Sequence, residues 1–242
     1  MTAADTADRD VVGFELSVVV PAFNEADRLP PTLARIGAFL GAHPDWKPAE
    51  IIVVDDGSCD GTALRAGEIA LANGIELRVV EHAKNRGKGA AVRTGFGLTT
   101  GRWVLLTDAD LSAPIEELAV LARAVSRPRH RDLMGRTFNL MLRGLRLTGI
   151  RDTQCGFKLF PGALARALAN VQRLDGFAFD VELLLLASAW GFKVHEVGVR
   201  WNHIEASRVL AGKHSIEMFG DTLRLWWWKA SGKLAPRPMA LE

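Results

Sequence analysis

The chain has 242 residues, of which 48% are hydrophobic and 24% are charged, and its formal net charge is +2. This length allows one large hydrophobic core with a small appendage, and the weak charge excludes nucleic acid as a partner. The sequence has no run of ~18 or more apolar residues, and residues 1–10 are polar and acidic, so we expect neither a membrane-spanning helix nor a signal peptide, and a cytoplasmic location.

Short strands and helices alternate along the first half of the chain. Apolar runs rich in β-branched residues predict strands at 16–20, 51–54 and 75–80, with another ending at 106. The spacing of apolar residues predicts helices at 29–40, 61–73, 90–99 and 114–125. This order predicts an α/β fold, in which a parallel sheet with right-handed crossovers carries helices on both faces.

Polar residues follow three of these strands directly. The first strand is followed by Pro21–Glu25, the second by Asp55–Ser58, and the fourth by a loop that contains Asp108 and Asp110. In an open parallel sheet, ligands bind outside the carboxyl ends of the strands. We therefore expect these three loops to form one site.

Asp108 and Asp110 lie two positions apart at the end of an apolar strand. Strand geometry projects alternate side chains to the same face, so both carboxylates can reach one divalent ion of the kind that usually holds a sugar-nucleotide diphosphate. Two acids after a strand are also typical of a solvated turn. The two neighbouring polar loops favour the metal site.

The segment Lys84–Gly89 is basic and contains two glycines at the start of a predicted helix. Its cations and the free N–H groups of the helix N-terminus can bind a diphosphate, and the glycines allow a ligand to approach the backbone closely. A solvated basic loop is the alternative. Asp55 or Asp56 could accept a hydrogen bond from the edge of a uracil base, although the same residues also fit a simple turn.

Several of these motifs together resemble a known family. Ser17–Glu25, Ile51–Ser58, Asn85–Gly89 and Asp108–Asp110 are similar to the successive motifs of family 2 inverting glycosyltransferases, which have the GT-A fold, a Rossmann-like and mostly parallel sheet flanked by helices on both faces. Within that family, Arg151–Phe160, Phe177–Leu183 and Trp201–Arg208 most resemble dolichyl-phosphate β-glucosyltransferases and related polyprenyl-phosphate sugar synthases. The resemblance runs from about residue 17 to residue 221.

The resemblance implies a UDP-sugar donor, with glucose as the hexose, and a polyprenyl-phosphate acceptor at the cytoplasmic face of a membrane. The implied catalytic residues are Asp110, Asp152 and Gln154, and the implied ligands of a Mg²⁺ or Mn²⁺ cofactor are Asp108 and Asp110. The implied nucleotide-sugar-binding residues are Pro21, Ala22, Phe23, Glu25, Asp55, Asp56, Arg86, Lys88, Asp108 and Ala109. The implied acceptor-binding residues are Arg127, Arg129, Arg131, Arg136, Ser207 and Arg208. The arginines also fit an ordinary solvated turn.

The chain departs from the family pattern at two places. The family has a further strand and a Gly-Ser-Arg-like turn after the helix predicted at 114–125, whereas here Ser126 leads directly to Arg127. Some members also carry a glutamine two residues beyond the second aspartate that assists the metal, and this chain has Ser112 there. The sequence therefore gives no third metal ligand in that loop.

The C-terminal segment 215–229 predicts an amphipathic helix. Ile216, Phe219, Leu223 and either Trp226 or Trp227 fall at helical spacing, with cations nearby. Tryptophans flanked by cations suit a bilayer surface, and a helix packed on the core or against a partner subunit is the alternative. We expect a polar tail at 1–14, a GT-A domain at 15–212, and this helix with its tail at 213–242.

Other functions stay open at this stage. A transferase that acts on the hydroxyl group of a soluble small molecule would share every donor motif and would need a carboxylate base, for which Asp152 is the candidate. A non-catalytic module that binds sugar nucleotides would not need the Asp108 and Asp110 pair, which this chain retains. The sequence also leaves open whether the chain forms a homodimer.

Overall fold

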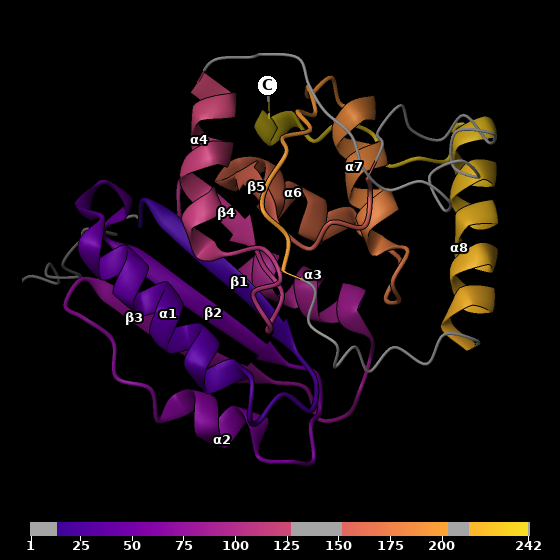
Figure 1. Ribbon diagram of the computed structural model, residues 1–242. Coiled ribbons are helices and arrows are strands. Elements are labelled where there is room, and N and C mark those ends of the chain that lie inside the picture. The colour runs from indigo at the N-terminus through magenta and orange to yellow at the C-terminus, as the bar shows by residue number, and fades with distance from the viewer. Residues whose placement is uncertain (1–13, 127–151, 203–212, 242) are drawn as a thin grey trace, which may run out of the picture.

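The computed structural model describes residues 14–126, 152–202 and 213–241 (Figure 1). The strands of these ranges form one sheet in the order β3-β2-β1-β4-β5. They are β1 (Leu16–Ala22), β2 (Ala49–Asp55), β3 (Ile75–Glu81), β4 (Trp103–Leu106) and β5 (Lys158–Pro161). Neighbouring strands are parallel except that β5 is antiparallel to β4. The predicted mostly parallel sheet is confirmed.

Helices cover both faces of the sheet, as the sequence predicts (Figure 1). The α-helices of the described residues are α1 (Leu29–Ala42), α2 (Thr62–Gly67), α3 (Lys88–Leu98), α4 (Leu118–Ser126), α6 (Gly162–Val171), α7 (Phe179–Ala189) and α8 (Lys213–Ala230). The short 3₁₀ helices are η1 (Pro44–Trp46), η2 (Ile115–Glu117) and η3 (Met239–Leu241). Within the described ranges, no helix is both long enough and apolar enough to cross a membrane.

Strand β1 is buried on both of its faces, and its residues alternate between two cores. Val18 and Val20 pack in the cluster that contains Leu33 of α1, whereas Val19 packs in the cluster that contains Val92 and Phe96 of α3. Successive side chains of a strand point to opposite faces, so an uninterrupted apolar strand needs helices on both sides. This explains why Leu16–Val20 is a continuous apolar run rather than an alternating one.

The register of the sheet brings the predicted site loops to one edge. Ala22, the last residue of β1, pairs with Asp55, the last residue of β2. Val19 pairs with Leu106, the last residue of β4. The loops after β1, β2 and β4 therefore begin at the same edge of the sheet, which is where ligands of open parallel sheets bind.

One predicted helix is much shorter in the structure. The helix expected at 61–73 is limited to Thr62–Gly67, and Leu64 in it is 71% exposed. A glycine is unfavourable inside a helix, which is consistent with the end of α2 at Gly67. The C-terminal helix predicted at 215–229 is present as α8, and it packs on the core, the alternative that the sequence left open, through Thr222 and Leu225, which are fully buried.

Candidate active site

The loops after β1 and β2 are joined by hydrogen bonds. Asn24 has a positive φ of 55°, and its backbone N–H donates to the Ser58 hydroxyl at 2.8 Å. The Glu25 N–H donates to Thr62 Oγ1 at 2.8 Å, and the Cys59 N–H donates to Asn24 Oδ1 at 3.1 Å. These bonds satisfy backbone groups of both loops, so the two loops form one rigid wall.

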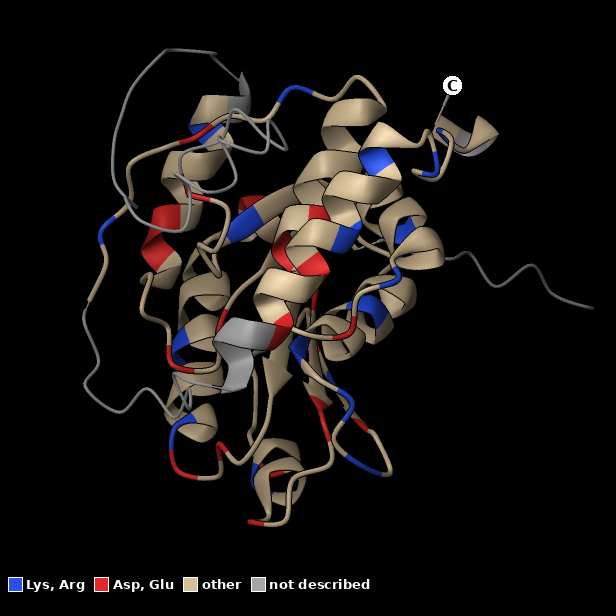
Figure 2. Ribbon diagram, turned by 90° about the vertical axis from the view of Figure 1, so that its right-hand side faces the viewer, with Lys and Arg blue, Asp and Glu red and all other residues tan. Residues whose placement is uncertain are grey.

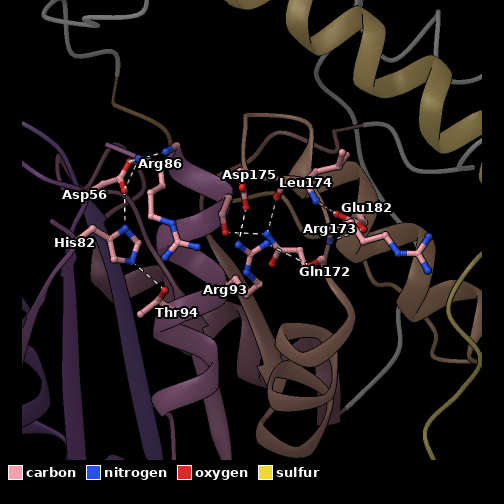
Figure 3. A network of polar contacts seen from close by, with 12 residues as sticks. Asp56, His82, Arg86, Arg93, Thr94, Gln172, Arg173, Leu174, Asp175 and Glu182 are labelled. Carbon is pink, nitrogen blue, oxygen red and sulfur yellow. Dashed lines mark hydrogen bonds and ion pairs between the residues drawn. The ribbon is translucent and has the colours of Figure 1, made fainter. Parts of the chain in front are cut away.

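The acids at the end of β2 accept hydrogen bonds from the protein itself. Asp55 is buried, and its Oδ1 accepts from the N–H and the hydroxyl of Ser58. Asp56 is also buried and contacts His82 Nδ1 at 2.6 Å (Figure 3). It accepts from the N–H groups of Arg86 at 3.0 Å and Gly87 at 2.7 Å. Asp56 therefore holds the start of the basic loop in place.

The glycines of the basic loop pack against a segment from the second half of the chain. Gly87 has a φ of 103°, and a Cβ atom there would overlap the carbonyl oxygen of Asp175. A Cβ atom on Gly89 would lie 2.5 Å from the carbonyl oxygen of Leu174. The close approach that these glycines allow is thus to the protein's own backbone.

Side chains of the second half complete this contact (Figure 3). Gln172 Nε2 donates to the carbonyl oxygens of Gly89 at 2.7 Å and Leu174 at 2.9 Å. Arg93 of α3 forms an ion pair with Asp175 at 2.7 Å. The basic loop is therefore fixed on one side by Asp56 and on the other by the segment before α7.

Asp108 and Asp110 follow β4 and face the basic loop. Asp108 Oδ1 lies 2.6 Å from Lys88 Nζ, the first residue of α3. Asp110 Oδ1 accepts from the Ser112 N–H at 2.9 Å. Gly156 lies against Asp108 so closely that a Cβ atom there would overlap its carboxylate. The absence of a side chain at 156 thus makes room for the acid.

A second ion pair lies next to the first, and no sequence motif predicted it. Lys158 Nζ of β5 lies 2.5 Å from Asp180 Oδ1 of α7, and both side chains are at most 10% exposed. Burial raises the pKa of Asp180, although Lys158 and Lys88 oppose that rise. Burial also disfavours the charged form of Asp108, but the charge and hydrogen bond of Lys88 and the charge of Lys158 hold its pKa below the usual value.

Lys88 connects the two pairs electrostatically. Burial disfavours its charged form, yet the attraction of Asp108 and Asp180 raises its pKa above the usual value. Opposite charges a few ångströms apart stabilise each other's ionised forms. Lys88 therefore stays protonated and provides a fixed positive charge beside the two acids that follow β4.

These loops line a cleft with a volume of about 1190 Å³. The predicted site residues that line it are Pro21, Ala22, Phe23, Glu25, Asp56, Arg86, Lys88, Asp108, Ala109 and Asp110. Its other wall comes from the second half of the chain, through Gly176, Phe177, Trp201 and residues of α8 that include Asp221 and Arg224. Sequence reasoning missed this wall, because its residues come together only through tertiary packing.

The remaining predicted residues lie elsewhere. Asp55 is adjacent to the cleft in sequence but does not line it. Asp152 and Gln154 line a neighbouring cavity of about 770 Å³ between β5 and the segment 192–201, and Trp201 lines both cavities. The predicted acceptor residues lie outside the described residues: Arg127, Arg129, Arg131, Arg136, Ser207 and Arg208.

The acids after β4 suit a hard divalent cation. Among the described residues, no group of three or more His, Cys, Asp and Glu side chains is arranged to hold a metal ion alone. Mg²⁺ and similar ions are commonly held by one or two carboxylates, with substrate phosphate oxygens and water completing the shell. Asp108 and Asp110 both line the cleft and supply such oxygens. The residues present therefore fit an ion that binds together with a diphosphate.

A mostly parallel sheet with acidic and basic loops that line a large cleft at its strand ends is the arrangement typical of the class of GT-A glycosyltransferases. A family model described as glycosyl transferase family 2 matches residues 17–140. The chain belongs to this family. The resemblance found in its motifs is thereby confirmed for the fold and the enzyme class.

Curated relatives match most of the chain. A dolichyl-phosphate β-glucosyltransferase of Drosophila melanogaster is 36% identical over 247 residues, covering 90% of this chain and 76% of that protein. The human protein of the same name is 33% identical over 239 residues, covering 86% and 74%. Similarity at this level over both chains extends well beyond the nucleotide-binding loops.

Solved structures share the fold at lower sequence identity. Mannosyl-3-phosphoglycerate synthase from Rubrobacter xylanophilus superposes with a TM-score of 0.67 at 21% identity, covering 95% of this chain and 79% of that one. Glucosyl-3-phosphoglycerate synthase from Mycobacterium tuberculosis, in complex with Mn²⁺, UDP-glucose and phosphoglyceric acid, gives 0.63 at 20% identity, covering 89% and 80%. These similarities support the fold assignment.

Proposed function

We propose that this chain transfers glucose from UDP-glucose to the phosphate of a dolichyl-like polyprenyl phosphate, with inversion at the anomeric carbon. The observation that carries the proposal is the cleft in which Asp108 and Asp110 face Lys88, within a chain that is 36% identical to a dolichyl-phosphate β-glucosyltransferase. The cleft has the charges that a sugar diphosphate needs. The relatives give the sugar and the acceptor.

The nucleoside of the donor would lie between the loops after β1 and β2. Phe23 is 44% exposed and lines the cleft, so its ring is available to pack on a base. Asp56 lines the same wall and would accept from the uracil imide N–H, in addition to the protein donors that it already contacts. The loop that Asp56 holds carries Arg86 and Lys88 toward the diphosphate.

Asp108 and Asp110 would hold Mg²⁺ or Mn²⁺ next to the diphosphate. When bound, such an ion neutralises the negative charge of the departing diphosphate. Lys88 supplies a further positive charge at the N-terminus of α3, where backbone N–H groups also favour anions. The first turn of α3 and the loop after β4 therefore act together on the leaving group.

A phosphate monoester is already an anionic nucleophile near neutral pH. One of its oxygens forms a bond to the anomeric carbon while the bond from that carbon to the UDP oxygen breaks, so no proton has to be removed from the nucleophile. Positioning and charge stabilisation then supply most of the rate enhancement. Attack from the face opposite UDP inverts the configuration.

The acceptor would enter from the side of Trp201, which lines both the donor cleft and the cavity that contains Asp152 and Gln154. We keep the predicted catalytic role of Asp152 and Gln154 and the predicted acceptor-binding role of the arginines at 127–136. Because a polyprenyl phosphate resides in a membrane, we propose that the reaction takes place at a membrane surface. We keep the predicted cytoplasmic side for it.

Radiolabelled UDP-glucose tests this proposal. Purified protein with Mg²⁺ or Mn²⁺ is incubated either with polyprenyl phosphate or with water-soluble sugar and phosphate acceptors. We expect label in the lipid fraction, released by mild acid as glucose, and NMR of the product should show a β linkage. Omission of metal with excess chelator should abolish transfer.

The same assay can overturn the proposal. Label only in a water-soluble product would identify a soluble acceptor. Asp152→Asn should then lower the transfer rate, because it removes the candidate base. UDP binding without transfer to any acceptor would indicate a non-catalytic module. Transfer of mannose from GDP-mannose in preference to glucose would refute the proposed donor.

A further inference from the structure

The outer face of α8 carries a cluster of exposed apolar side chains. Phe219, Leu223, Trp226 and Trp227 are 49%, 41%, 43% and 48% exposed. They follow one another at the helical spacing of three or four residues, except that the two tryptophans are adjacent. We call this set the α8 aromatic face.

The α8 aromatic face is distinct from the face that holds the helix on the protein. Thr222 and Leu225 are fully buried, and Leu225 packs with Val181 and Leu185 of α7. The helix is therefore anchored by one stripe while a second apolar stripe points away. Figure 1 shows α8 as the outermost helix on the side beyond α7.

Exposed large apolar residues are concentrated here. Elsewhere in the described residues, Phe23 and Trp201 line the donor cleft, whereas Leu64 and Met239 are isolated. Single exposed apolar residues are ordinary, but a contiguous group marks a surface that meets something apolar. The cluster on α8 is thus the feature that requires a partner.

Basic side chains lie on the C-terminal side of the α8 aromatic face. From residue 222 to residue 241 the chain contains Arg224, Lys229, Lys233 and Arg237 and no acid. The acids of α8 are Glu217 and Asp221, nearer its N-terminus, and Asp221 forms an ion pair with Arg224 at 2.9 Å. Lys233 Nζ lies 4.1 Å from the ring centroid of Trp227, so cation and aromatic ring are side by side. Figure 2, which faces this side of the molecule, shows both acidic and basic segments along α8.

Tryptophan rings next to basic side chains are the combination that binds the headgroup region of a bilayer. The rings enter the boundary between headgroups and acyl chains, while the ammonium and guanidinium groups contact lipid phosphates. Each basic residue adds attraction to an anionic membrane surface. We propose that the α8 aromatic face docks on an anionic phospholipid bilayer.

Docking through this face would bring the bilayer to the rim of the cleft. The inner side of α8 contributes Met218, Asp221 and Arg224 to the cleft lining, one helix diameter away from the aromatic face. A lipid-borne phosphate could then reach the donor without leaving the membrane. The delivery of a lipid phosphate to the donor rests on the proposed function, whereas the docking of α8 on the bilayer does not.

Vesicle flotation tests the docking in the absence of any substrate. The full chain is mixed with vesicles of phosphatidylcholine containing one quarter phosphatidylglycerol, or with phosphatidylcholine alone. We expect the wild type to float with the anionic vesicles and less with the neutral ones. The variant Trp226→Gln/Trp227→Gln should partition at least about tenfold less.

Two controls keep this result specific. Leu64→Gln/Met239→Gln removes two exposed apolar side chains outside the face and should float as the wild type does. An unchanged UDP affinity, measured by calorimetry, shows that the tryptophan variant is folded. The independent variant Phe219→Gln/Leu223→Gln should reproduce its loss of flotation.

Several outcomes would overturn the docking proposal. It fails if the wild type does not float, or if both aromatic-face variants float like the wild type. It also fails if sedimentation velocity shows a wild-type dimer that the variants convert to monomers without any vesicle binding, since the face would then join two subunits. Flotation of the wild type without glucose transfer to lipid phosphate would instead refute the proposed function and leave the docking intact.

Discussion

The loop after β2 and the loop after β4 both place acids at the same edge of the sheet, yet their carboxylates have different partners. Asp55, Asp56 and Asp60 accept hydrogen bonds from protein N–H and hydroxyl groups. Asp108 instead pairs with the ammonium group of Lys88. Carboxylates whose partners are backbone donors shape a loop, whereas a carboxylate whose partner is an ammonium group brings a cation to the site of a charged ligand.

The acids of the two loops look alike in sequence but have different tasks. The acids after β2 belong to the wall of the proposed nucleoside pocket, and Asp56 fixes the basic loop. The acids after β4 lie beside Lys88 and Lys158 and face the reacting diphosphate in the proposed mechanism. Variants of the two loops should therefore affect different measurements.

The largest effect is expected after β4. Asp110→Asn should lower the rate of glucose transfer by at least about 100-fold, because it removes charge from the proposed metal site. Its melting temperature should stay near the wild-type value, since no apolar packing is lost. Asp45→Asn, an exposed acid on η1 away from the cleft, is the matched control. Wild-type rates for Asp110→Asn at saturating Mn²⁺ would contradict the metal assignment.

The buried pair beneath this site should matter for stability. Removal of one partner of a buried ion pair leaves an uncompensated charge, so Asp180→Leu or Lys158→Met should each lower the free energy of unfolding by about 3–5 kcal/mol. The double variant should lose less than the sum of the two single variants, as urea unfolding can measure. Strict additivity would show that the two side chains do not interact.

Asp56 is expected to contribute to UDP binding in two ways, since it lines the cleft and holds the basic loop. Asp56→Ala should weaken UDP binding by about 1–3 kcal/mol, because a hydrogen bond to the base and the support of the loop are both lost. Calorimetry with UDP measures this directly. If UDP affinity stays at the wild-type value, the base binds elsewhere and Asp56 serves the loop alone.

Much of the fold follows from local patterns. Continuous apolar runs such as Leu16–Val20 and Ile51–Val54 identify strands buried on both faces, and their polar ends identify the edge of the sheet where the site lies. These patterns depend on neighbouring residues only, which is why the sequence suffices for them.

Other parts of the site depend on contacts between distant segments. Lys158 and Asp180 are 22 positions apart, and neither belongs to a strand-end loop of the first half. Trp201 and Arg224 join the cleft only after the second half has packed against the first. Periodicity also cannot show which of two apolar stripes on α8 is buried, because Phe219 and Trp226 have the same seven-residue spacing as Met218 and Leu225.

The smallest effect is expected for an acid that joins the loops after β1 and β2. Asp60 Oδ2 accepts from the Ala26 N–H at 3.2 Å, and its Oδ1 accepts from Thr62 Oγ1 at 2.5 Å. Slight burial disfavours its charge, but these hydrogen bonds hold its pKa below the usual value of 3.8. Its charged form therefore stabilises the fold at pH values above 3.8, and this stabilisation is lost as the pH falls through the lowered pKa.

Asp60→Asn should accordingly lower the free energy of unfolding by about 1 kcal/mol or less at neutral pH, since the site is close to solvent. The difference from the wild type should be constant from pH 7 down to about pH 4 and should vanish in stronger acid, where Asp60 is itself neutral. Urea unfolding across this range measures it, and the transfer rate should stay unchanged. A large loss of activity with no change in stability would place Asp60 with the acids after β4 and would remove the distinction between the two loops.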